Sequence, residues 1–214
     1  MTDTIPTLHV NDHPLVKHKR TILSDVTTDS KTFRELIREI TRLVLYEATR
    51  DLPVTPFTYR TPLEETIGST ISASVGVVPI LRAGLGMVDA AIDAIPSAHV
   101  WHLGMYRDET THQPVSYYNR LPEKNPDDIV FLLDPMLATG GSASDAITVL
   151  KDWGAPKITF VGILAAPEGA RRVYADHPDV EMYVAALDRE LDEHKYIRPG
   201  LGDAGDRLFD TLQH

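Results

Sequence analysis

Residues 129–142 read Ile-Val-Phe-Leu-Leu-Asp-Pro-Met-Leu-Ala-Thr-Gly-Gly-Ser, and no other stretch of the chain is as informative. The apolar run 129–133 ends at a charged residue, Asp134, and a short loop then leads into a helical pattern over 142–153. This order predicts a buried strand, a loop and the start of a helix. It places Asp134 at the carboxyl edge of a parallel sheet, where open α/β sheets bind their ligands.

The loop between this strand and helix has the features of an anion site. Gly140 and Gly141 can adopt positive φ and leave room for a close approach. The amides of residues 138–142 can converge on an anion at the positive end of the helix, and we expect Ser142 to cap that helix. Strand, acid, Thr-Gly-Gly-Ser turn and helix together predict a sugar-phosphate site.

Strands and helices alternate from residue 75 onward, which favours an α/β fold with a mostly parallel, doubly wound sheet. The polar excursion 107–120 is too long for a simple strand–helix link, and its Val-Ser-Tyr-Tyr run at 115–118 predicts a protruding hairpin. The predicted strands are 75–81, 100–106, 129–133, 158–165 and 180–186, and the predicted helices among them are 84–95, 142–153 and 169–175.

A further helix is predicted nearer the N-terminus. Thr32 and Glu35 form a capping-box pattern, and apolar residues then recur at helical spacing. We predict that this helix runs from Thr32 to about Arg50.

The remaining N-terminal segments give weaker signals. Residues 51–74 contain three prolines and are predicted to be loops with a helical turn near 63–67. Residues 1–29 show no clear periodicity, and the basic cluster 17–20 is interpreted as a solvated surface patch.

The composition of the 214 residues, 43% apolar and 24% charged, is ordinary for a globular protein. The absence of cysteine excludes disulfides, thiolate metal sites and cysteine nucleophiles. No apolar run approaches the roughly 18 residues of a membrane span, and residues 1–11 show no secretory signal, so we expect a cytoplasmic protein. A net charge of −10 argues against non-specific nucleic-acid binding. An anionic substrate must therefore be held by local cations and amides.

Residues 134–142 resemble the loop that binds 5-phosphoribosyl-1-pyrophosphate (PRPP) in type I phosphoribosyltransferases. Their variant, Asp-Pro-Met-Leu-Ala-Thr-Gly-Gly-Ser, is similar to that of the uracil phosphoribosyltransferase family in particular. The resemblance spans almost the whole chain. Its further segments are Val-Pro-Ile-Leu-Arg-Ala-Gly-Leu-Gly-Met at 78–87, Ala-Ala-Pro-Glu-Gly at 165–169, Tyr-Ile-Arg-Pro-Gly-Leu-Gly-Asp-Ala-Gly-Asp at 196–206, His-Pro-Leu-Val-Lys-His at 13–18 and Tyr-Glu-Ala-Thr-Arg at 46–50.

The resemblance implies transfer of the 5-phosphoribosyl group from PRPP to N1 of uracil, giving UMP and pyrophosphate in pyrimidine salvage. It also implies one domain over residues 1–214 with a core of about 70–187. The N-terminal helix region and residues 188–206 would pack on that core as a small hood.

The resemblance further implies which residues bind PRPP. Arg82 and Arg107, each at the end of a predicted strand, would bind pyrophosphate, since planar guanidinium donors match phosphate oxygens. Asp134 would face the ribose hydroxyls and favour positive charge on the ring, and Asp134 and Arg107 are the expected catalytic residues. The whole expected PRPP set is Arg82, Arg107, Asp134, Pro135, Met136, Leu137, Ala138, Thr139, Gly140, Gly141, Ser142 and Asp203.

The resemblance also implies that the main chain of a C-terminal loop binds uracil. Its O2 and O4 accept hydrogen bonds and its N3–H donates one, and a backbone turn can match that pattern without a charged side chain. Tyr196 is expected either to cover the site or to pack within the loop. The expected uracil residues are Ile197, Gly202, Asp203 and Ala204.

Three details qualify the resemblance. Mg²⁺ is the expected cofactor, bound mainly through PRPP with an indirect contribution from Asp203. Where many type I members carry two adjacent acids, this chain has Asp134-Pro135, as the uracil enzymes do. Arg-Glu-Leu-Asp at 189–192 and Lys195 depart from the Gly-Leu-Asn and Gly common in the family.

Two alternatives stay open from the sequence. One is an RNA-binding attenuation regulator with the same fold, which a basic face would favour, and the other is a purine-specific transferase. The expected partners are PRPP and uracil, a homo-oligomer of the chain, and GTP as an open candidate effector, with no nucleic acid or membrane.

Overall fold

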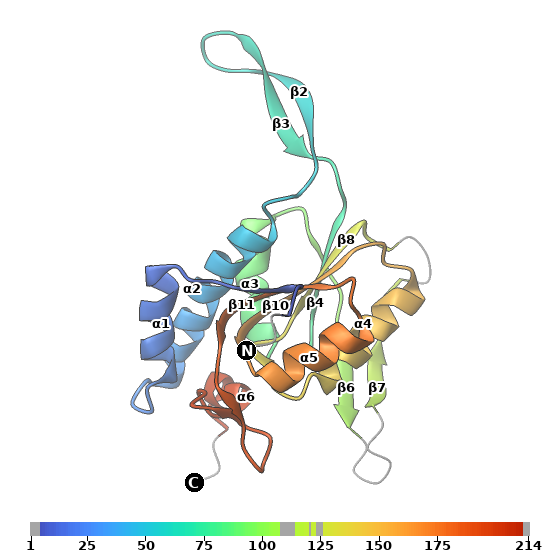
Figure 1. The fold of residues 1–214 in the computed structure, drawn as a ribbon. Helices are drawn as coiled ribbons and strands as arrows, with labels where there is room; N and C mark the ends of the chain where they lie inside the picture. Colours follow the sequence, from blue (N-terminus) through green and yellow to red (C-terminus); the bar gives the residue numbers. More distant parts are fainter. Residues whose placement is uncertain (1–4, 108–113, 120, 123–125, 212–214) are drawn as a thin grey trace.

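The structure is a computed structural model that describes residues 5–107, 114–119, 121–122 and 126–211, with the backbone alone for 105–107 and 114–119. Its centre is a parallel sheet with strand order β1-β11-β10-β8-β4-β5, in which β9 also pairs with β10 (Figure 1). The strands of this sheet are β1 (Leu8–Val10), β4 (Val75–Pro79), β5 (His99–Val100), β8 (Ile129–Leu133), β9 (Met136–Leu137), β10 (Ile158–Ala165) and β11 (Glu181–Leu187).

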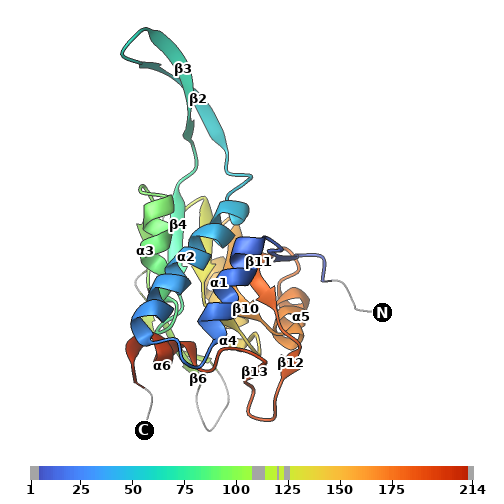
Figure 2. The same cartoon turned by 90° about the vertical axis from the view of Figure 1, so that its left-hand side faces the viewer.

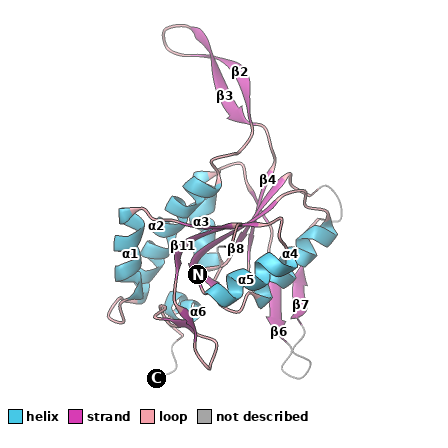
Figure 3. Ribbon diagram, viewed as in Figure 1, coloured by secondary structure: helices cyan, strands magenta, loops and turns pink. Residues whose placement is uncertain are grey.

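Helices cover both faces of the sheet (Figures 2 and 3). Strand β8 shows why, because Phe131 and Leu133 pack into the core on one side and Val130 and Leu132 into the core on the other. The first core is completed by α1 (Pro14–Ser24), α2 (Ser30–Ala48), α3 (Leu85–Ala94) and α6 (Ala204–Phe209), and the second by α4 (Gly141–Trp153) and α5 (Pro167–Asp176). This arrangement confirms the predicted fold class.

The predicted strand 100–106 is wrong as a single element. After β5 the Trp101 indole turns aside and donates to Asp127 (2.8 Å). The chain then forms β6 (Leu103–Arg107), which pairs antiparallel with β7 (Pro114–Asn119). The hairpin predicted in the 107–120 excursion is confirmed by this pairing.

The prediction of loops and a helical turn over 51–74 is also wrong. This segment forms an antiparallel hairpin, β2 (Val54–Arg60) and β3 (Glu65–Ile71), that projects away from the sheet (Figure 1). Proline does not prevent these strands, because Pro56 lies on a two-stranded ribbon whose outer edges need no ladder partner. The β-branched and aromatic residues of β2 were the signal that the prolines obscured.

The helix predicted from Thr32 begins two residues earlier. Asp29 is its N-cap and accepts a hydrogen bond from Thr32 N (2.8 Å), so the capping box expected at Thr32 is wrong. Helix α1 and strand β1 lie in the region that gave no sequence signal. Among the described residues, no helix is long and apolar enough to cross a membrane.

Candidate active site

The anion loop, residues 138–142, follows β8 and β9 and enters α4. Gly140 occupies the N-cap position with φ +76°, and a Cβ there would lie 2.5 Å from the carbonyl oxygen of Gly169. Glycine is therefore required for both conformation and space. The expectation that Ser142 caps this helix is wrong, since Ser142 is an exposed residue of the first turn. Its amide remains among the helix-start donors that have no partner within the helix.

Asp134 lies directly after β8, as the sequence predicted. Its Oδ1 accepts a hydrogen bond from Met136 N (3.1 Å). Burial raises the pKa of the Asp134 carboxyl to about 7, although the Met136 hydrogen bond opposes the shift. The ionisation of a carboxyl with a pKa near 7 changes strongly at neutral pH when a positive charge is placed beside it.

A cavity of about 270 Å³ joins Asp134 to the C-terminal part of the chain. Three sequence segments that are far apart meet here, at the carboxyl edge of the sheet, as expected for an open α/β fold. The residues that line the cavity are Ala83, Asp134, Met136, Ala138, Lys195, Tyr196, Ile197, Gly202, Asp203, Ala204 and Gly205.

The structure thus brings Asp134, Met136 and Ala138 of the expected PRPP set together with all four expected uracil residues. Tyr196 lines the same cavity and is about half exposed. Asp203 has a structural role as well, because its Oδ1 accepts a hydrogen bond from Asp206 N (2.9 Å) at the start of α6.

The C-terminal segment, residues 196–204, depends on two glycines with positive φ. Gly200 has φ +67°, and a Cβ there would lie 2.1 Å from the carbonyl oxygen of Ile197. Gly202 has φ +82°, and a Cβ there would meet its nearest atom, Arg207 Cδ, only at 4.0 Å. Glycine is therefore required at position 200 by both conformation and space, and at position 202 by conformation alone.

Two charged groups, the buried Asp188 and the half-buried Arg207, hold this segment in place, and the sequence analysis indicated neither. Asp188 accepts a hydrogen bond from Gly200 N (2.9 Å) and forms an ion pair with Arg20 of α1. Arg207 donates to the carbonyl oxygens of Leu201 and Leu23 (2.9 Å each). We call Asp188 and Arg207 the clamp.

The clamp corrects one interpretation made from the sequence. Arg20 belongs to the basic cluster expected to be solvated, yet it pairs with an Asp188 side chain that is only 4% exposed. The two residues are separated by 168 positions, so no local pattern could have indicated the contact.

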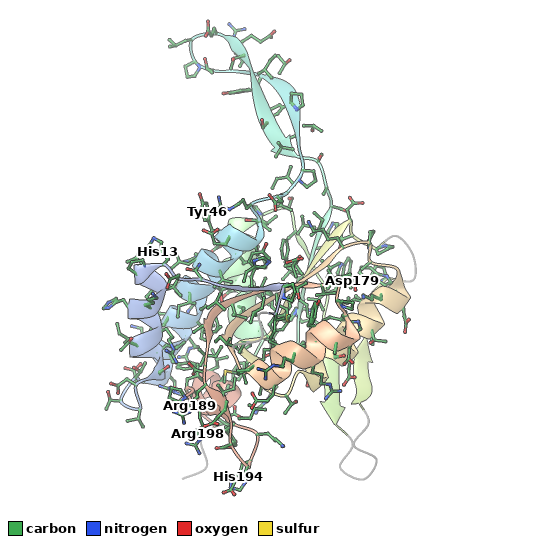
Figure 4. The ribbon with its side chains drawn as sticks, viewed as in Figure 1. His13, Tyr46, Asp179, Arg189, His194 and Arg198 are labelled. Carbon is green, nitrogen blue, oxygen red and sulfur yellow. The ribbon has the colours of Figure 1, made fainter. Side chains whose placement is uncertain are left out.

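The two departures from the family pattern lie in the hairpin formed by β12 (Glu190–Leu191) and β13 (Ile197–Arg198): residues 189–192 include β12, and Lys195 lies in the turn, near the labels of His194 and Arg198 in Figure 4. Lys195 has φ +68°, a conformation that favours glycine, which is the residue common in the family. Asp192 stabilises the turn by accepting hydrogen bonds from Tyr196 N (2.9 Å) and Arg198 Nε (2.7 Å).

The two expected pyrophosphate cations differ in what the structure describes. Arg82 lies beside α6, with its Nη2 3.5 Å from Asp206 Oδ1, and its side chain is 61% exposed. Arg107 ends β6, but its side chain lies outside the described part of the chain. A long, loosely paired guanidinium at the strand edge can reorient toward a polyanion.

Two larger cavities are also found among the described residues, and the second shares Gly202 and Asp203 with the Asp134 cavity. One of about 490 Å³ beside β1 and α2 includes Asp12, Glu47 and Asp51, whose carboxylates suit a polyanion poorly. One of about 1040 Å³ lies between the α1–α2 connection and residues 198–203. Neither includes Asp134 or the anion loop.

Comparison with known proteins agrees with this geometry. A uracil phosphoribosyltransferase of Roseiflexus sp. (strain RS-1) is 57% identical over 202 residues, covering 94% of this chain and 97% of the relative. A solved structure of a protein from Aquifex aeolicus matches with a TM-score of 0.90 at 36% identity, covering 97% of this chain and all of that one. A hypoxanthine phosphoribosyltransferase from Trypanosoma cruzi shares the fold alone, with a TM-score of 0.51 at 14% identity over 74% of this chain and 76% of that chain.

A family model described as uracil phosphoribosyltransferase matches residues 10–211. Together with 57% identity over nearly the whole length of a relative, this match settles the relationship. The chain belongs to the uracil phosphoribosyltransferase family.

Proposed function

We propose that this chain transfers the 5-phosphoribosyl group of PRPP to N1 of uracil, giving UMP and pyrophosphate. The observation that carries the proposal is the single cavity shared by Asp134 and Ala138 on one side and Ile197 and Gly202 on the other. PRPP and uracil must meet within bonding distance, and this cavity is where the two expected subsites meet.

In the PRPP half of the site, different residues bind the 5′-phosphate, the pyrophosphate and the ribose. The anion loop takes the 5′-phosphate through amides at the start of α4 and the Thr139 hydroxyl. Arg82 and Arg107 take the pyrophosphate, the leaving group that gains negative charge as the C1′–oxygen bond breaks. Asp134 accepts hydrogen bonds from the ribose hydroxyls and, once ionised, stabilises the positive charge that develops on the ring.

The uracil half reads hydrogen-bonding groups through the main chain of Ile197, Gly202, Asp203 and Ala204. Uracil is held with N1 toward C1′, and N1 forms the new bond while pyrophosphate departs. Cytosine presents an amino donor where uracil presents O4, which sets donor against donor. A mismatch of this kind discriminates by about 10⁴-fold in comparable sites.

Phosphoribosyltransferases generally use Mg²⁺ with PRPP, and the donors present here fit a metal carried by the substrate. Among the residues that the structure describes, no group of three or more His, Cys, Asp or Glu side chains is arranged to hold a metal ion. Asp134 and Asp203 nevertheless supply carboxylate oxygens to the cavity, the ligand type that Mg²⁺ prefers. When bound, the metal neutralises charge on the pyrophosphate.

We also propose that the chain forms a homo-oligomer through the β2–β3 hairpin. The hairpin exposes large apolar side chains along its length, among them Phe57, Tyr59 and Ile67, and Leu63 at its tip is 94% exposed. An isolated two-stranded hairpin is at best marginally stable in water, and an apolar projection of this kind favours burial against a partner. A second copy of the chain supplies that partner.

The test of the reaction is a panel of nucleobases. The protein is incubated with PRPP, Mg²⁺ and uracil, cytosine, hypoxanthine or adenine, and nucleotide formation is followed, with and without GTP. We expect UMP from uracil and at least 10³-fold slower turnover of the other bases. Turnover of hypoxanthine or adenine would favour the purine alternative, and no turnover of any base would leave the RNA-binding alternative.

A further inference from the structure

The first turns of α5 pack directly on the anion loop. A Cβ at Gly169 would lie 2.3 Å from the carbonyl oxygen of Ala138, and a Cβ at Gly140 would lie 2.5 Å from the carbonyl oxygen of Gly169. These two glycines let the backbones of helix and loop approach each other. Any side chain on the same face of α5, one turn later, must therefore lie over the loop.

Arg172 is that side chain, because it stands three residues after Gly169 on the same helical face. Its Nη1 lies 3.2 Å from the point where a Cβ of Gly141 would sit, and Thr139 Oγ1 lies 3.5 Å from the same point. A guanidinium and a hydroxyl from different elements therefore flank one position at the start of α4. The Arg172 guanidinium and the Thr139 hydroxyl thus lie beside the same residue, Gly141, where the anion loop enters α4.

The charge of Arg172 is only weakly compensated. Its ion pair with Asp176 runs through Nε at 3.6 Å, and Asp176 Oδ2 also accepts a hydrogen bond from Ser144 (2.7 Å). The closest contact of that pair is made by Nε, whereas Nη1 is the atom that faces Gly141. The side chain is 38% exposed, so a ligand at the loop can reach it.

We propose that Arg172 is a binding residue for the 5′-phosphate, acting with the amides of the anion loop on both PRPP and UMP. The inference rests on the proposed function, because that function places the phosphate at the loop. It adds to the site a cation that comes from α5 rather than from the loop itself. A planar guanidinium suits this position since it can donate two parallel hydrogen bonds to phosphate oxygens.

Two ligands distinguish binding at the 5′-phosphate subsite from binding at the pyrophosphate subsite. Ribose 5-phosphate carries the 5′-phosphate alone, and pyrophosphate with Mg²⁺ carries the leaving group alone. Their dissociation constants are measured by calorimetry on the wild-type protein, Arg172→Ala, Arg172→Gln and, as the matched control, Arg171→Ala. Arg171 is the exposed neighbour of Arg172 in the sequence and in the same helix.

We expect both Arg172 variants to weaken ribose 5-phosphate at least tenfold, the effect of losing a charge-assisted hydrogen bond. Pyrophosphate binding should change less than twofold, and Arg171→Ala should change neither. Arg172→Gln keeps most of the side-chain packing, so it separates lost binding from a disturbed α5.

The inference is overturned if the Arg172 variants bind ribose 5-phosphate normally, or if pyrophosphate weakens to the same extent. If the wild-type protein uses uracil and PRPP normally but these results fail, only the role of Arg172 falls. If the wild-type protein binds neither ligand, the proposed function fails and the inference falls with it.

Discussion

Asp134 is half-buried, and in the proposed reaction it lies beside the reacting sugar. Because burial raises its pKa to about 7, near neutral pH the carboxyl is ionised in only part of the free protein. The proposed role requires the carboxylate, so kcat/KM for PRPP should rise with pH through about 7 and then level off. A rate profile that is flat between pH 6 and 8.5 would contradict this role.

Replacement of Asp134 by asparagine should slow turnover by at least 10²-fold, because the neutral amide cannot stabilise charge on the ring. The amide oxygen can still accept the hydrogen bond of Met136 N, so the fold should persist. Single-turnover rates at saturating PRPP and uracil measure the effect. Normal turnover per folded molecule would exclude Asp134 from the chemistry.

The same substitution should lower turnover, but it should increase the stability of the protein relative to wild type as the pH rises. The folded pKa of Asp134 lies above its ordinary value of 3.8, so its contribution to stability is fully present below about pH 4 and is lost as the pH rises through about 7. Asparagine carries no such cost. The melting temperature of Asp134→Asn relative to wild type should therefore increase between pH 5 and pH 8, and a constant or falling difference would contradict the burial argument.

A substitution at Gly202 tests whether uracil is bound by the main chain of the C-terminal segment. Its φ of +82° strains a β-branched residue although the surrounding space is open. Gly202→Val should raise the KM for uracil at least tenfold, with a smaller change for PRPP. Leu201→Met, which conserves volume at the buried neighbour of Gly202, should change either KM less than threefold. Unchanged uracil use by Gly202→Val would show that the loop is not the base site.

At the scale of elements, the clamp connects the C-terminal segment to α1 and to the loop after it. Arg207 also donates to the carbonyl oxygens of Asp25 (2.7 Å) and Thr28 (3.3 Å), and its guanidinium lies 4.4 Å from the centre of the Phe33 ring. The geometry of residues 196–204 thus depends on N-terminal elements that do not reach the cavity.

Asp188→Asn tests the clamp, because an amide NH₂ placed between Gly200 N and Arg20 sets a donor against at least one of them. We expect a loss of about 2 kcal/mol in stability, in the range of hydrogen bonds to charged groups. We also expect a KM for uracil raised at least fivefold and a nearly unchanged KM for PRPP. The matched control is Asp179→Asn. Asp179 forms an ion pair with Lys151 of α4 (2.6 Å) and lies near α4 and α5 (Figure 4). A loss of stability without a change in KM would make the clamp purely structural.

The sequence predicted those elements whose fold is decided locally. Strands β8 and β10 are continuous apolar runs buried on both faces, and the sequence predicted both with the bounds that the structure has. Helix α6 was missed because it is six residues long within a segment rich in glycine and aspartate. The β2–β3 hairpin was missed because its strands lie outside the main sheet and three prolines fall before, within and just after β2.

The candidate site likewise contains residues that the sequence could predict and residues that it could not. Asp134 and the anion loop follow from one contiguous stretch, so their place at the sheet edge could be predicted. The clamp and Arg172 could not, because the contacts of Asp188 with Arg20 and of Arg172 with Gly141 join residues from separate elements. Side chains that act across elements leave no periodic signal in the sequence.

At the scale of the whole molecule, we propose that residues 1–214 fold as one domain, since α2 packs into the same core as β10 and α6. The β2–β3 hairpin is the exception that points outward. Replacing residues 56–69 by a short Gly-Ser turn should shift the protein to a smaller assembly while the sheet remains folded. Light scattering after size-exclusion chromatography measures this. An unchanged mass would exclude the hairpin as the interface.

In the proposed reaction one ligand bridges the anion loop and the C-terminal segment. A crystal structure with UMP tests it directly, because UMP carries both the 5′-phosphate and the uracil ring. We predict the phosphate on the amides of residues 138–142 and beside Arg172, the ribose facing Asp134, and the ring hydrogen-bonded to the main chain of residues 197–204. UMP bound instead in the cavity beside β1 and α2, or away from the anion loop in the cavity beside the α1–α2 connection, would contradict this placement.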